Sequence, residues 1–172
     1  MRWLLVLLLS LASLHLQAQL SATSSGMSWT CTRSGDHLIM ELTTPTTGWV
    51  GVGFNQENRI LESDLLLFHV VDGQAEGTDL FVKGMGDPRA DTELGGSVDV
   101  KILSFREGDG QTYIKFKRPF PAADDFDFHF QEGAAFWLIL AYSTHDEFAH
   151  HSRVRQHRQV VFRACLDFII WP

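Results

Sequence analysis

Apolar and polar residues alternate with a period of two along much of the chain. Between Gly48 and Phe54 (GWVGVGF), the residues Val50, Val52 and Phe54 share one face, whereas a tryptophan and two glycines share the other. Successive side chains of a β-strand point to opposite faces of its sheet, so this alternation predicts a strand. Glycines on one face leave room for close approach by another backbone or by a flat ligand.

The same reasoning predicts nine to ten strands and no amphipathic helix. The segment 134–142 (AAFWLILAY) is apolar throughout, which is typical of a central strand covered on both faces. Phe126, Phe128 and Phe130 alternate with polar residues, and the glycine-rich stretch 83–97 is predicted to be a long loop. Other strand-like segments are 27–33, 37–43, 64–71, 98–105, 112–117 and 159–170. Turn residues recur at the spacing of a sandwich or barrel, so the fold class is predicted to be all-β, in one domain.

The first 18 residues form a separate segment. A short basic start precedes an apolar run, and Leu16-Gln17-Ala18 resembles a signal-peptidase site. We therefore predict a signal peptide at 1–18, a flexible leader at 19–26 and the folded domain at 27–172; the alternative is an uncleaved membrane anchor. The mature protein is expected to be secreted, extracellular or periplasmic, without a transmembrane segment.

Charge and cysteine content limit which partners and which cellular environment we expect for this protein. The net charge is -7, and loss of 1–18 removes only Arg2, which gives -7 - 1 = -8. An acidic protein is not expected to bind nucleic acid through phosphate contacts. In an exported chain, Cys31 and Cys165 are expected to form a disulfide between the first and last strands; two buried free thiols are the alternative.

Histidines gather late in the chain. His145, His150, His151 and His157 fall in a polar segment and could bind a metal or a haem iron through imidazole nitrogen; the alternative is a solvated loop. Met85, in a glycine-rich setting, is a candidate thioether ligand, with a packing role as the alternative.

Catalytic motifs are lacking in the sequence. It contains no Gly-x-Ser-x-Gly element, and the Gly51-Val52-Gly53 segment lies in a predicted strand and opens no helix, so it does not fit a dinucleotide-binding loop. No nucleophile, base and orienting group can be assembled, so the protein is predicted not to be an enzyme.

Two segments together resemble a known family. The GWVGVGF strand followed by 63–67 (SDLLL), and 136–143 (FWLILAYS) followed by 150–153 (HHSR), resemble the DOMON domain over about residues 27–163. That family includes the cytochrome domain of cellobiose dehydrogenase and the N-terminal domain of dopamine β-monooxygenase. The resemblance implies an immunoglobulin-like β-sandwich, of nine to ten antiparallel strands here, outside the cytoplasm, which binds b-type haem or a sugar.

The resemblance also implies axial ligands for a haem iron. Family members use a methionine after the GWVGVGF strand, where this chain has Ile60 or Leu61, and a late histidine, here His150 or His151. Met85 or His69 would then supply the second ligand, or a single histidine would hold the iron.

Two functions follow as hypotheses. The first is an electron-transfer module with haem b and a redox partner protein. The alternative is a non-redox module that binds carbohydrate or protein, with Trp49 or the 126–130 phenylalanines as aromatic platforms for a sugar.

Overall fold

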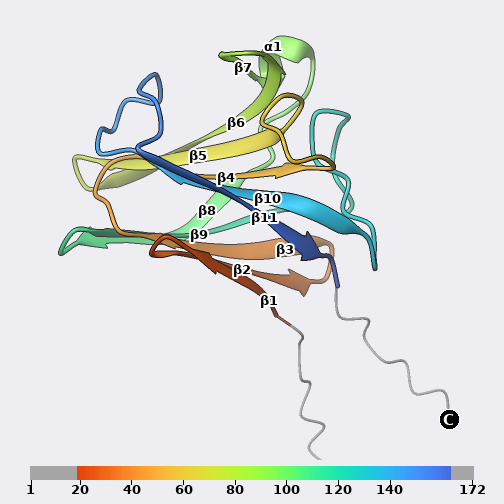
Figure 1. Cartoon of the computed structure of the whole chain (residues 1–172), viewed down its shortest axis with the longest axis horizontal. Helices are drawn as coiled ribbons and strands as arrows, with labels where there is room; N and C mark the ends of the chain where they lie inside the picture. The colour runs from red at the N-terminus through yellow and green to blue at the C-terminus, as the bar shows by residue number, and fades with distance from the viewer. Residues whose placement is uncertain (1–18, 164–172) are drawn as a thin grey trace, which may run out of the picture.

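Two antiparallel β-sheets packed face to face make up the domain (Figure 1). The computed structural model describes residues 19–163. One sheet has the order β1-β2-β3-β9-β8, formed by Leu20–Ser24, Met27–Ser34, His37–Thr44, Gln111–Pro119 and Lys101–Gly108. The other has the order β11-β10-β4-β5-β6-β7, formed by Val154–Val161, Ala135–Tyr142, Val50–Asn55, Asp64–Val71, Gln74–Gly84 and Asp87–Ala90. The predicted all-β sandwich is confirmed, with eleven strands in the described residues.

Several segments differ from their predicted structure. Strand β6 lies where no strand was predicted, and β11 begins before the predicted 159–170 segment. Residues 20–24 were expected in a flexible leader but form β1, because Leu20 and Ala22 pack against the core while the backbone pairs with β2. The 83–97 segment holds the end of β6, the short strand β7 and one helical turn, α1 (Asp91–Leu94). The 126–130 segment is irregular and forms no strand.

Alternating strands supply the core between the sheets. Trp29 of β2, Phe54 of β4 and Phe136 of β10 are buried and pack ring against ring. Phe128 and Phe130 join this aromatic cluster from the irregular segment, with ring centroids 6.1 and 5.0 Å from that of Phe54. The alternation of phenylalanines at 126–130 therefore serves core packing without strand pairing.

Two predictions fall on residues that the structure does not describe. The signal peptide at 1–18 and Cys165 lie outside the described range, so cleavage and the disulfide stay predictions. Cys31 is buried in β2. Within 19–163, no helix is long and apolar enough to cross a membrane.

Candidate functional site

The predicted ligands lie at two ends of the six-stranded sheet. His150 and His151 are exposed in the loop between β10 and β11, at the left of Figure 1, and His69 near the end of β5 contacts this loop. Nδ1 of His69 lies 2.8 Å from the Asp146 carbonyl oxygen, and its ring stacks on Phe148 at 4.3 Å. His69 therefore anchors the loop.

Met85 lies at the other end of the sheet. It follows β6, whose first residues pair with the end of β5, and its side chain is 86% exposed. The eight residues between Glu76, which pairs with His69, and Met85 extend roughly 25–30 Å along a strand. The structure does not bring Met85 together with His69, His150 or His151.

A different histidine lies beside the loop where the family methionine would fall. His157 of β11 pairs with Ile139, and its Nδ1 lies 2.8 Å from Oδ1 of Asn58 in the β4–β5 loop. Burial lowers the pKa of His157. Ile60 and Leu61 in that loop have no atom that can ligate iron.

The glycine face of β4 is filled by the protein's own side chains. A Cβ added to Gly51 would lie 2.6 Å from Cδ2 of Leu67, and one added to Gly53 would lie 3.2 Å from Cδ1 of Leu65. The expected room for a flat ligand is thus taken by two leucines of β5. Since Met85 lies at the opposite end of the sheet from the predicted histidines, and the β4–β5 loop has no methionine, the described residues do not fit a haem with the predicted axial His–Met pair.

The aromatic platforms proposed for a sugar are also engaged. Trp49 is 5% exposed, and its indole Nε1 donates to the His150 carbonyl oxygen at 3.1 Å. Phe128 and Phe130 pack on the core, and Phe126 packs against Phe81 at 5.6 Å. All four rings therefore take part in packing within the domain.

A buried ion network lies between the sheets, at the end of the sandwich away from the histidine loop. The inward positions of β9 are Thr112, Ile114, Phe116 and then Arg118, so the strand period places a guanidinium in the core. Nη1 of Arg118 donates to Asp64 of β5, and its Nη2 donates to Asp127. Asp64 also accepts from the Phe128 amide at 2.7 Å.

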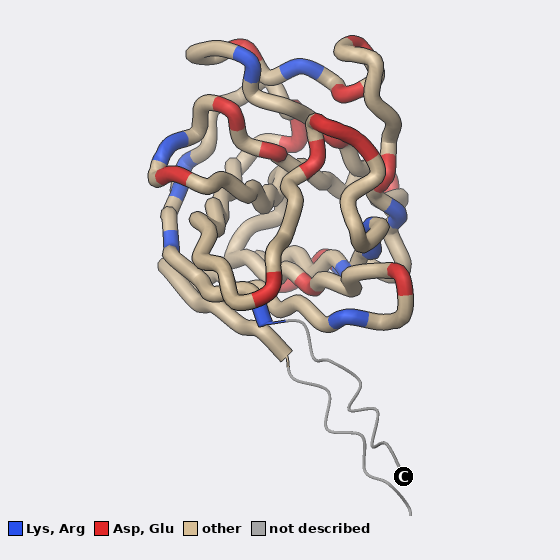
Figure 2. The backbone as a smooth tube through the Cα atoms, turned by 90° about the vertical axis from the view of Figure 1, so that its right-hand side faces the viewer, with Lys and Arg blue, Asp and Glu red and all other residues tan. Residues whose placement is uncertain are grey.

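Further aspartates surround this network. They are Asp79 of β6, Asp91 of α1, Asp99 before β8, and Asp124. Two overlapping groups, Asp64–Asp79–Asp127 and Asp91–Asp124–Asp127, each have carboxylate oxygens within 4.8 Å of one another. The five residues of these two groups, together with Asp99, are called the aspartate cluster. Figure 2 shows acidic segments from separate parts of the chain gathering in the upper half of the molecule.

Several oxygens of the aspartate cluster have no hydrogen-bond partner among the described residues. Asp91 is 1% exposed and both of its carboxylate oxygens are unpartnered; Oδ1 of Asp79 and Oδ2 of Asp99 are unpartnered as well. Buried polar atoms are nearly always satisfied in folded proteins, so a group of unsatisfied oxygens calls for an explanation. A bound cation would provide one.

Electrostatics agree with this geometry. Burial raises the pKa of Asp79 to about 8 and that of Asp91 to about 7, and the Asp64 carboxylate adds to both shifts. Burial and a contact with Asp127 raise the pKa of Asp99 to about 6. Arg118, a cation that lowers the pKa of both Asp79 and Asp91, is already bonded to two other carboxylates. When its carboxyl groups are ionised, the cluster therefore carries more negative charge than Arg118 balances.

The chemistry of the donors selects the ion. Carboxylate oxygens are hard ligands and suit Ca²⁺, Mg²⁺ or Mn²⁺, whereas they hold soft ions poorly. The loop that leads from α1 to β8 lies close against the cluster, since a Cβ on Gly96 would lie 2.6 Å from Oδ2 of Asp124. Sequence reasoning did not single out Asp124 or Asp127 as site residues. The signals it passed over were Arg118 at an inward position of β9 and Asp64 at the start of an apolar strand.

Comparison with known proteins gives a family match and several relatives. The family model of the DOMON domain matches residues 22–143. MOXD1 homolog 1 from Drosophila melanogaster is 26% identical over 102 residues, which cover 59% of this chain and 15% of that protein. DBH-like monooxygenase protein 2 from Mus musculus is 31% identical over 100 residues, which cover 58% and 16%. The matched region therefore spans about a sixth of these curated relatives.

Two solved structures share the fold. The cytochrome b domain of pyranose dehydrogenase from Coprinopsis cinerea superposes with a TM-score of 0.60 at 13% identity, over 78% of this chain and 76% of that one. The cytochrome domain of Myriococcum thermophilum cellobiose dehydrogenase gives 0.56 at 12% identity, over 81% and 76%. At this level of identity the likeness shows the sandwich architecture.

Proposed function

The chain belongs to the DOMON domain family, and we propose that it works as a non-catalytic, non-redox binding module whose aspartate cluster holds a calcium ion. The observation that carries the proposal is Asp91, whose two carboxylate oxygens lie buried among other carboxylates and have no hydrogen-bond partner within residues 19–163. Calcium accepts six to eight oxygen ligands in flexible geometry, which suits aspartates from several loops better than the strict octahedron of magnesium. If the chain is exported as its first residues predict, millimolar calcium outside the cell can fill a site of modest affinity.

A bound calcium ion would fasten the open end of the sandwich. The cluster draws residues from β5, β6, α1, the segment before β8 and the 120–134 segment. One ion that contacts several of these would link segments that lie far apart in the sequence. The module would then present a rigid loop surface to a carbohydrate or protein partner.

The direct test is a calcium titration of the metal-free protein, followed by calorimetry and by thermal unfolding. We expect binding of calcium and a rise in the unfolding temperature, and Asp91→Asn should weaken binding by at least about tenfold. The same variant without metal should be as stable as the parent or more so, because it removes a buried carboxylate that repels its neighbours.

Asp125→Asn is the matched control. Asp125 is exposed and adjoins Asp124, but lies outside the aspartate cluster. It should leave both calcium affinity and stability close to those of the parent. Calcium binding that is equal in the parent and in Asp91→Asn would contradict the assignment.

Haem is the second candidate, favoured by the two cytochrome domains that share the fold. Because Leu65 and Leu67 fill the glycine face, we expect no sharp Soret band when the purified protein is titrated with haem. A Soret band in the parent that vanishes in His157→Ala would reverse this conclusion and make His157 the ligand. Loss of the band in a His150/His151 double variant would instead assign the ligand to the β10–β11 loop.

A further inference from the structure

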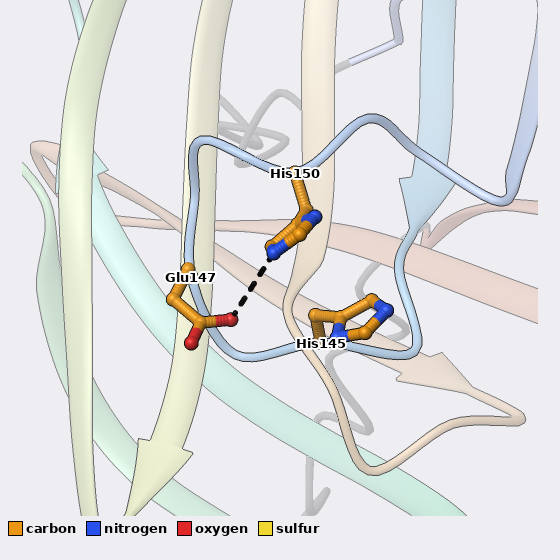
Figure 3. A group of neighbouring side chains, drawn as sticks. All are labelled: His145, Glu147 and His150. Atoms are coloured by element: carbon orange, nitrogen blue, oxygen red, sulfur yellow. Dashed lines mark ion pairs between the residues drawn. The ribbon is translucent and has the colours of Figure 1, made fainter.

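We propose that His145, Glu147 and His150 form a second, independent site, for a borderline transition-metal ion such as Zn²⁺ or Cu²⁺. The three residues lie in the loop between β10 and β11 (Figure 3). This loop and the aspartate cluster lie toward opposite ends of β5, since His69 near its end contacts the loop and Asp64 at its start belongs to the cluster. The two sites can therefore be tested separately.

The backbone of the loop is fixed at both histidines by one buried residue. The Trp49 amide donates to the His145 carbonyl oxygen at 2.9 Å, and the Trp49 indole donates to that of His150 at 3.1 Å. The His150 amide closes the turn onto the Glu147 carbonyl oxygen at 3.0 Å. Consequently the Cα positions of the three donors are set before any ion arrives, which lowers the entropy that binding would cost.

The loop separates anchoring residues from metal donors. Asp146 accepts from His69 through its carbonyl oxygen, and Phe148 stacks on the His69 ring, so both hold the loop to the sheet. His145, Glu147 and His150 are all exposed. Their side chains have no other described partner within the fold that binding would have to break, apart from the contacts among themselves.

The donor atoms already lie close together. The imidazole rings of His145 and His150 stack at 4.3 Å between centroids, and Oε2 of Glu147 lies 3.7 Å from Nε2 of His150. One ligand atom from each residue falls within 4.8 Å of the others. Figure 3 shows the Glu147 carboxylate directed toward the His150 ring, with the His145 ring on the same side of the loop.

Two imidazoles and one carboxylate form a ligand set that suits zinc. Such a set leaves one position of a tetrahedral ion open for water or a ligand from a partner. Imidazole nitrogen also suits copper, whereas the all-oxygen aspartate cluster favours hard ions, so the two sites should select different metals. His151, the neighbour of His150 in the same loop, is not a member of the group.

The test is calorimetric titration of the untagged chain with Zn²⁺, and in parallel with Cu²⁺, in excess calcium so that the aspartate cluster is filled. We expect one tight equivalent per chain. His145→Ala and His150→Ala should each weaken it at least about tenfold, and Glu147→Gln should weaken it less. His151→Ala is the matched control: the same residue type in the same loop, expected to keep the parent affinity.

Folding does not confound this test, because all three donors are exposed, and unfolding temperatures without zinc should match the parent. The proposal is overturned if the parent takes up no zinc or copper, if the His145/His150 double variant binds as the parent does, or if His151→Ala weakens binding equally. The His145/His150 double variant should still bind calcium, because its aspartate cluster is unchanged. A loss of zinc binding with calcium binding intact then separates the outcome for this site from the outcome for the aspartate cluster.

Discussion

Replacing Arg118 with methionine is expected to lower the free energy of unfolding by about 3–5 kcal/mol. The guanidinium is 2% exposed and donates to Asp64 and Asp127, which are as deeply buried. Methionine fills a similar volume but removes the charge. The two buried carboxylates therefore lose their counter-ion, while the neighbouring aspartates still repel them. The loss should follow from unbalanced charge more than from packing.

Urea unfolding followed by tryptophan fluorescence measures this effect, since Trp29 lies in the core. Lys115→Met is the control, because Lys115 pairs with Glu41 at 3.0 Å on the surface of the same strand and should cost no more than about 1 kcal/mol. Adding Asp64→Asn and Asp127→Asn to the Arg118 variant should recover part of the stability. Equal losses in the Arg118 and Lys115 variants would show that the buried network contributes little.

Much of the sheet could be predicted from residue patterns. The strict alternation at 48–54 predicts β4 (Val50–Asn55), and the apolar run at 134–142 predicts β10 (Ala135–Tyr142), because these strands are central and buried. Alternation failed at 126–130, where Asp127 bonds Arg118 and the flanking phenylalanines fill the end of the core. A period of two describes which side chains face the core, and a backbone can meet it without pairing in a sheet.

The sites were less accessible to sequence reasoning, because they depend on which strand ends meet. The order β10-β4-β5-β6 places His150 and Met85 at opposite ends of the sheet, a relation that spacing along the chain does not contain. The aspartate cluster is assembled from segments between Asp64 and Asp127, each with one or two acids that look solvated in isolation. A lone charged residue at an inward strand position, such as Arg118, is the local signal that could have indicated it.

The second large effect that we expect is a loss of stability when the divalent cation is removed, and this loss should grow as the pH rises. With calcium at a hundred times its dissociation constant, chelation should cost about 2.7 kcal/mol of stability. The metal-free protein should also become less stable as the pH rises from about 4 to 8. Asp79 and Asp91, with pKa values of about 8 and 7, hold protons in the folded state that the unfolded chain releases near its ordinary pKa of about 4.

The sign follows from proton binding. Between those pH values the folded protein binds more protons than the unfolded chain, so each such aspartate lowers stability by up to about 1.4 kcal/mol per pH unit as the pH rises. Calcium binds the ionised carboxylates and replaces the protons, so the loss should be small in its presence. Unfolding temperatures at pH 5, 6.5 and 8, in chelator and in excess calcium, should therefore diverge with pH, and Asp91→Asn in chelator should show a shallower decline. Parallel curves in chelator and calcium would instead mean that these aspartates neither hold protons nor bind the ion, and that the buried charge is balanced by other groups.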